Sequence, residues 1–277
     1  MFDLDKQKLQ SIESGFHIPS KPKVLSEMTT ELEGADPSLE RLASIIAKDI
    51  NLSSLLLKTI NSPLFGLQRT ITDIPQATMV LGFVQLKRLV TVALLRESFS
   101  GDACISLERF WDESLEVANA CIWIGKEYKS LVPADYVYTL GLFHNVGLAA
   151  MAIKFKDYVD VLKEDNENTQ LSITQLENAK YNCDHAVLGY YIASSWHLPK
   201  PLCNLILNHH EANLVLGMKD KHDRIAYSIL KCAENAVYYS RYLEHSKEWS
   251  IVGGMCLEEL SISDEEYSDL VSDFADK

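Results

Sequence analysis

A chain of 277 residues, of which 47% are hydrophobic and 23% charged, has the composition of a globular protein and can bury a large core. Its formal net charge of −13, from 26 basic and 39 acidic residues, argues against binding to nucleic acid or to anionic membranes. The 6 cysteines form no Cys-x-x-Cys pair, which argues against a disulfide framework or a zinc-thiolate site. With no signal peptide and no unbroken apolar run of roughly 20 residues, we expect a cytoplasmic protein.

Nearly every segment shows the periodicity of helices. Apolar residues recur every three or four positions, no stretch alternates convincingly with a period of two, and no Asn-Gly or Asp-Gly hairpin turn occurs. In chain order, the expected helices cover residues 36–50, 53–66, 74–82, 83–99, 107–131, 133–151, 172–180, 184–196, 199–211 and 222–245. The segment 101–106 is the clearest break in the first half.

Several helix starts carry a side chain that can accept hydrogen bonds from the unpaired backbone N–H groups of the first turn. Asp36 is placed to cap the first of these helices, with proline next to it. Thr72 or Asp73 is placed to cap the helix expected over residues 74–82. Asp184 is placed to cap the helix that follows it at residue 185.

The acidic C-terminus also predicts a helix. Ser263 and Glu266 form a capping box, and an apolar stripe follows at helical spacing. The stripe consists of Tyr267, Leu270, Val271 and Phe274. Such a helix either docks on the body of the protein with its acidic face in solvent, or detaches to occupy a groove on a partner.

Histidines are the most informative residues of the second half. His144, His185, His209 and His210 all fall in expected helices, and imidazoles that converge inside a helical bundle can bind a metal. The alternative for each is a hydrogen-bonded core histidine. His144 is followed at once by Asn145, so this pair resembles a metal-binding His-Asp doublet whose carboxylate has become an amide.

Four motifs in a fixed order resemble the HDOD domain, the HD-related output domain of the HD phosphohydrolase superfamily. They are FWDESLEVANA, LGLFHNVG, CDHAVLGYYIASSWHLP and LILNHHE. The first half agrees, notably in IPSKPKVLSEMTTEL and ITDIPQATMVLG, so the resemblance covers residues 16–245. Its most specific points are Ile18-Pro19, Asn61-Ser62-Pro63 and Trp196-x-Leu198-Pro199.

The resemblance implies where a metal site would lie. Active relatives hold one or two metals with a histidine from an early helix, a His-Asp doublet and a later aspartate. The early position matches Glu113, the doublet matches His144 and Asn145, and the late position matches Glu234 or Asn235. A single neutral carbonyl oxygen, such as that of Asn145, bridges two ions poorly and does not help to activate water.

His185 and His209 match histidines that some members of the superfamily use as additional ligands. The predicted remnant site consists of Glu113, His144, Asn145, His185, His209, His210 and Asn235. Because these positions depart from the active pattern, we expect no catalytic residue and no cofactor. A divalent ion (Mn, Fe, Mg or Ni) is the alternative.

The resemblance also implies the fold and its parts. We expect an all-α protein in which a smaller N-terminal helical subdomain accompanies an HD-like helical bundle. The expected parts are an N-terminal helix or extension (1–17), the N-terminal helical part (18–100), a degenerate HD-like bundle (101–245) and an acidic C-terminal segment with an amphipathic helix (246–277).

The predicted function is that of a non-catalytic output or scaffold domain in bacterial signal transduction, with protein partners and a nucleotide-like ligand as a further option. The competing hypothesis is a metal-dependent phosphohydrolase acting on a nucleotide or cyclic dinucleotide, and a third is a nucleotide-binding module without turnover. Asn61, Ser62 and Pro63 form either a plain helix stop or a loop that contacts a partner.

Overall fold

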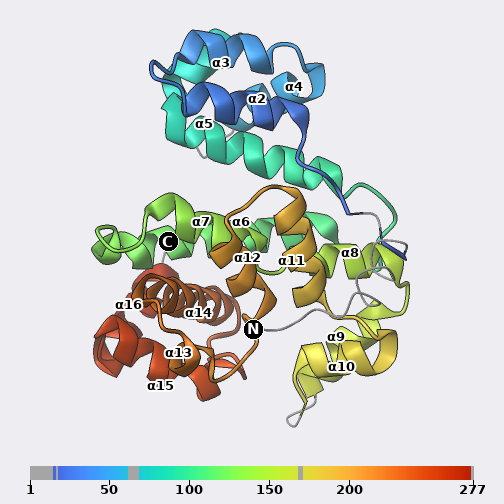
Figure 1. Ribbon diagram of the computed structural model, residues 1–277, viewed down its shortest axis with the longest axis vertical. Coiled ribbons are helices and arrows are strands. Elements are labelled where there is room, and N and C mark those ends of the chain that lie inside the picture. The colour runs from blue at the N-terminus through green and yellow to red at the C-terminus, as the bar shows by residue number, and fades with distance from the viewer. Residues whose placement is uncertain (1–14, 17, 62–68, 168–170, 276–277) are drawn as a thin grey trace. The chain divides into compact units, whose positions relative to one another are not determined.

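The structure is a computed structural model that describes residues 15, 16, 18–61, 69–167 and 171–275. All regular elements in these ranges are helices, and no strand occurs among them, which confirms the all-α prediction. The chain divides into two compact units (Figure 1). One contains Pro19–Ser100, and the other contains Gly101–Lys277 with the residues that precede Pro19.

The described residues of the smaller unit form four helices, in which α5 packs against the other three. They are α2 (Lys23–Leu32), α3 (Leu39–Ile46), α4 (Ile50–Ile60) and α5 (Ile74–Ser98). Asp73 caps α5 by accepting from the N–H of Gln76, so of the two predicted caps the aspartate is used. The prediction that Asp36 caps α3 is wrong, because the Ser38 side chain accepts from the N–H of Arg41 instead.

Two helical stretches, Ile74–Ser98 and Ala134–Lys154, are long and apolar enough to cross a membrane by length and composition. The second is mostly buried inside its own unit, as core helices are. The first is interrupted at Gly82, whose φ of 66° lies outside the helical region. Gly82 therefore separates the two helices that were expected before and after it.

Asn61, a predicted partner contact, is engaged within its own unit. Its side-chain Nδ2 donates to the carbonyl oxygens of Leu57 and Ile71, each at 2.8 Å, and its Oδ1 accepts from the N–H of Ile71 at 2.8 Å. The amide therefore ties the end of α4 to the chain before α5. Ser62 and Pro63 lie outside the described residues.

Replacing Asn61 by alanine is expected to lower the free energy of unfolding by about 1–3 kcal/mol, because the Ile71 backbone groups lose their partner. Chemical denaturation of the full chain measures this. Asn51→Ala, at an exposed position of the same helix, is the matched control and should change stability by less than about 0.5 kcal/mol. Equal effects of both substitutions would contradict the role of the Asn61 hydrogen bonds in holding the end of α4 to Ile71.

The larger unit is built around one long helix, α14, which packs against α6, α7, α12, α13, α15 and α16. Its α-helices in the described residues are α6 (Leu107–Ile124), α7 (Ala134–Phe143), α8 (Val146–Lys154), α9 (Tyr158–Glu167), α10 (Ile173–Tyr181), α11 (His185–Ser195), α12 (Lys200–Leu207), α13 (Leu214–Gly217), α14 (Lys221–Tyr242), α15 (Trp249–Leu260) and α16 (Asp264–Ala275), and a 3₁₀ helix, η2 (Gly125–Tyr128), follows α6. The single helix expected over 133–151 is in fact two, because α7 ends and α8 begins at the doublet.

Close helix crossings bring the doublet and the later histidines together. A Cβ atom on Gly147 would lie 1.9 Å from the carbonyl oxygen of His185, so α8 and α11 pack backbone against backbone at this point. A Cβ atom on Gly141 would lie 2.8 Å from the Cα of Ala118, so α7 and α6 also approach each other closely. Only glycine permits either contact.

The C-terminal helix is docked on the larger unit. The predicted capping box is present: Glu266 Oε2 accepts from the N–H of Ser263 at 2.8 Å, and Ser263 Oγ accepts from the N–H of Glu266 at 3.2 Å. Tyr267 is buried, and its ring stacks on Trp249 with the centroids 4.5 Å apart. Of the two alternatives for this helix, the structure shows the docked one.

Candidate functional site

His144 lies buried at the junction of α7 and α8. Its Nδ1 is 2.7 Å from the carbonyl oxygen of Gly141, an acceptor that requires the Nδ1–H to donate. Its Nε2 consequently faces the side chain of Glu234 on α14, with Oε1 at 3.3 Å. The ring is held in one orientation, with its outer nitrogen directed at a carboxylate.

Asn145 is directed at His209. Its Oδ1 is 3.1 Å from His209 Nε2, and the other ring nitrogen of His209 donates to the carbonyl oxygen of Ile206 at 2.6 Å. Burial, followed by the neighbouring His210, holds the pKa of His209 well below its usual value. The amide of the doublet thus faces an imidazole and brings no charge to it.

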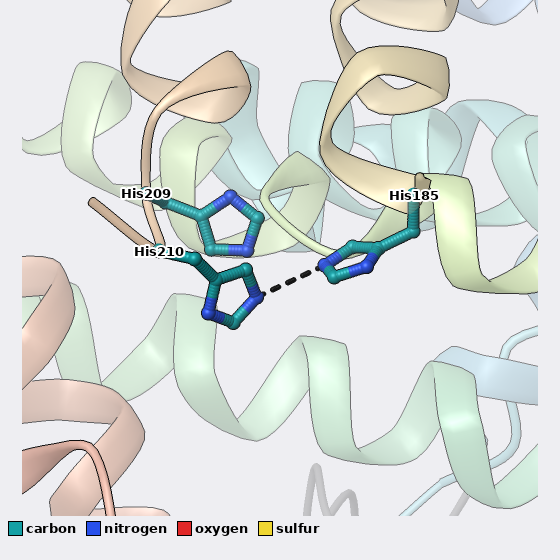
Figure 2. A group of neighbouring side chains, drawn as sticks. All are labelled: His185, His209 and His210. Carbon is teal, nitrogen blue, oxygen red and sulfur yellow. Dashed lines mark hydrogen bonds between the residues drawn. The ribbon is translucent and has the colours of Figure 1, made fainter. Parts of the chain in front are cut away.

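Three histidines form a compact cluster (Figure 2). His185 stands at the start of α11, and His209 and His210 follow the end of α12. One ligating nitrogen from each can be chosen such that all lie within 4.8 Å of one another. The Nε2 atoms of His185 and His210 are 3.0 Å apart, which means that one ring donates to the other.

His185 is oriented by a buried carboxylate that the sequence does not reveal. Glu177 on α10 accepts from His185 Nδ1 at 2.8 Å, from the His185 N–H at 3.0 Å and from the Tyr158 hydroxyl. Burial raises the pKa of Glu177, but the charge and donors of His185 outweigh it and the net shift is downward. For His185 burial lowers the pKa, and Glu177 outweighs it to give a net rise.

A buried lysine joins the two carboxylates that face the histidines. Lys231 Nζ lies 2.8 Å from Glu234 Oε2 and 3.1 Å from Glu248 Oε1, and its side chain is 2% exposed. Burial lowers the pKa of Lys231, but the two carboxylates outweigh it and raise the pKa overall. Glu248 also faces His210, with Oε2 at 3.4 Å from Nδ1.

The prediction that Glu113 belongs to this site is corrected by the structure. Its side chain is 56% exposed and pairs with Arg241, whose other guanidinium nitrogen binds Glu116. The buried face of α6 carries Trp111, Ser114, Val117, Ala118 and Cys121. Glu113 lies out of phase with that face, so its carboxylate meets solvent and not the buried histidines.

Asn235 is also placed differently from the prediction. It is buried, but its Nδ2 donates to the Tyr267 hydroxyl at 3.0 Å and its Oδ1 accepts from the N–H of Ser246 at 3.0 Å. These bonds hold α16 and the connection between α14 and α15. Of the two candidates for the late position, Glu234 is the one beside His144.

The histidine cluster has donors suited to a divalent ion. Two imidazole nitrogens 3.0 Å apart can both sit about 2.0–2.2 Å from one metal, and imidazole suits zinc, iron, nickel and copper.

Asp184, as predicted, caps α11 by accepting from the N–H of Val187. What the doublet lacks is the negative charge that would bridge two ions or stabilise a bound hydroxide.

The described residues thus form an all-helical bundle in which histidines gather near the His144–Asn145 doublet. The family model for the HDOD domain matches residues 18–212, and the chain belongs to that family. Its fold is similar to that of an HDOD domain protein from Geobacter sulfurreducens, with a TM-score of 0.69, 21% identity and 96% of each chain covered.

Two further solved structures share the fold. A candidate phosphohydrolase from Shewanella amazonensis SB2B has a TM-score of 0.71 at 18% identity, with 97% of this chain and 93% of that one covered. A candidate signal transduction protein from Marinobacter aquaeolei VT8 has a TM-score of 0.72 at 14% identity, with 98% of this chain and 62% of that one covered. At these identities the likeness shows the fold alone.

The chain also resembles part of a longer protein in two bacteria. It is 26% identical over 194 residues to a protein of Treponema pallidum (strain Nichols), covering 70% of this chain and 37% of that protein. It is 27% identical over 155 residues to YuxH of Bacillus subtilis (strain 168), covering 50% and 37%. The chain thus matches little more than a third of each relative.

Proposed function

We propose that this chain is a non-catalytic output or scaffold domain of bacterial signal transduction, located in the cytoplasm, that acts by binding protein partners. The observation that carries the proposal is the doublet. Asn145 brings no negative charge and lies against the ring of His209. Hydrolysis of a phosphodiester on a metal needs an activated water, and the carboxylate that would stabilise it is absent from this position.

The charge of the chain supports proteins as partners. A net charge of −13 disfavours nucleic acid and anionic membranes as binding surfaces. Family membership and the likeness to a candidate signal transduction protein are consistent with a place in a signalling pathway.

A metal-dependent phosphohydrolase, acting on a nucleotide or a cyclic dinucleotide, is the second candidate. The histidine cluster favours it, because its ligating atoms lie within 4.8 Å of one another. His185, His209 and His210 would hold the ion, and of Mn, Fe, Mg and Ni their imidazoles suit Fe and Ni, which would supply Lewis acidity. His144 and Glu234 would stand beside it, with Nε2 and Oε1 3.3 Å apart.

Phosphodiesterase assays with manganese separate the two candidates. We expect the wild-type chain to hydrolyse bis-p-nitrophenyl phosphate and a cyclic dinucleotide no faster than the His185→Ala variant does. Working enzymes typically turn over at about 1–10³ per second, so activity would be obvious. Turnover that is lost in His185→Ala, together with stoichiometric metal in the wild type, would overturn the proposal.

A further inference from the structure

Two carboxylates surround the position of Lys231 and favour a cation there. Lys231 lies on α14, is almost fully buried, and its Nζ contacts one oxygen each of Glu234 and Glu248. The Tyr227 ring adds a further contact, with its centroid 5.7 Å from Nζ. Glu248 comes from outside α14, directly before α15, so the two carboxylates converge on the ammonium from separate segments.

Each of the two carboxylates uses its second oxygen for a histidine of the site. Glu234 directs Oε2 at Lys231 and Oε1 at His144, whereas Glu248 directs Oε1 at Lys231 and Oε2 at His210. The ammonium therefore stands at the centre of a chain that runs from the doublet to the histidine cluster. Carboxylates in that position would otherwise be available to balance the charge of a divalent ion beside the imidazoles.

We propose that Lys231 is a built-in cation that neutralises Glu234 and Glu248 in place of a metal ion, and so lowers the affinity of the neighbouring histidine cluster for divalent cations. This inference rests on the proposed non-catalytic function and supplies a reason for it that is separate from Asn145. Buried carboxylates need a compensating charge, and the lysine provides it permanently. A divalent ion entering beside it meets carboxylates that are already paired and a positive charge that repels it.

Lys231→Met removes the charge while keeping an unbranched side chain of similar length. We expect this variant of the full chain to bind Mn²⁺ or Zn²⁺ about 10- to 100-fold more tightly than the wild type, measured by calorimetry and by metal content after dialysis. Lys231→Arg, which keeps the charge, is the matched control and should resemble the wild type. His185→Ala in the Lys231→Met background should abolish the gain and so locate the ion. A Lys231→Met affinity equal to the wild type, or an equal gain in Lys231→Arg, would overturn the inference.

A second pair of variants covers a failure of Lys231→Met to fold. Glu248→Gln and Lys231→Met/Glu248→Gln differ only in the lysine, and the double variant removes one charge of each sign. We expect Mn²⁺ to raise the melting temperature of the double variant more than that of Glu248→Gln, because a ligand that binds the native state stabilises it. Equal shifts in the two variants would contradict the inference.

The inference and the proposed function can fail separately. Turnover by the wild type would overturn the non-catalytic proposal whatever the lysine variants do. The role of Lys231 is judged by the difference in metal affinity between wild type and Lys231→Met, which requires no substrate.

Discussion

Replacing Gly147 by alanine is expected to prevent the larger unit from reaching its native packing. The added Cβ would lie 1.9 Å from the His185 carbonyl oxygen and 2.9 Å from the N of Gly189. Both are backbone atoms, so the methyl group can be accommodated only if α8 and α11 separate. We expect a loss of more than about 3 kcal/mol in the free energy of unfolding, at or beyond the upper end for overpacking. Urea denaturation followed by near-ultraviolet circular dichroism measures it.

Gly254→Ala is the matched control for this prediction. Gly254 lies inside α15, and a Cβ there would meet nothing within 4 Å. Alanine costs less backbone entropy than glycine in a helix, so this variant should be as stable as the wild type or more stable by about 0.5–1 kcal/mol. A Gly147→Ala protein as stable as the wild type would show that α8 and α11 do not cross as closely as described.

Glu177→Gln is expected to destabilise the larger unit by about 3–5 kcal/mol, because it breaks a buried charge pair by removing one partner. The carboxylate is inaccessible and accepts from the His185 backbone N–H, the His185 ring and the Tyr158 hydroxyl. An amide has one acceptor oxygen, and its NH₂ group would face one of these donors. Denaturation measures the stability, and nitrogen NMR of the His185 ring reports whether Nδ1 keeps its proton.

An exposed glutamate provides the comparison. Glu164→Gln on the neighbouring helix α9 makes the same chemical change in solvent and should alter stability by less than about 0.5 kcal/mol. If Glu177→Gln behaved in the same way, the buried pair would contribute nothing beyond its shape, and the orientation of His185 would have to come from packing alone.

Local signals were sufficient for most of the secondary structure. Helical periodicity predicted an all-α chain, and Asp73, Asp184 and the capping box of α16 are all used as expected. The start of α3 was missed because a non-local contact decides it. Glu31 accepts from the N–H of Ser38, which fixes Ser38 as the first residue before the helix.

The candidate site was predictable only in part. Histidines and the doublet stand out in the sequence because imidazoles are few and occur in an ordered series of motifs. Glu113 was assigned by motif position, and the helical phase of α6 turns it to solvent, where Arg241 binds it. For the late position the sequence left Glu234 and Asn235 open, and neighbours one residue apart on a helix point about 100° apart. The crossing of α14 with α7 and α16 decides which of them meets His144.

The sequence by itself determined that this chain is all-helical, that it belongs with HD-type domains and that its doublet lacks a carboxylate. These properties are local, since they depend on spacing and on residue type. Only the tertiary structure decided that Glu177, Lys231 and Glu248 lie beside the histidines. In the sequence nothing distinguishes them from exposed polar residues, because only packing buries them. Burial then makes a partner obligatory, and packing decides which one: Glu248 meets His210 and Glu234 meets His144 from segments far apart in the chain.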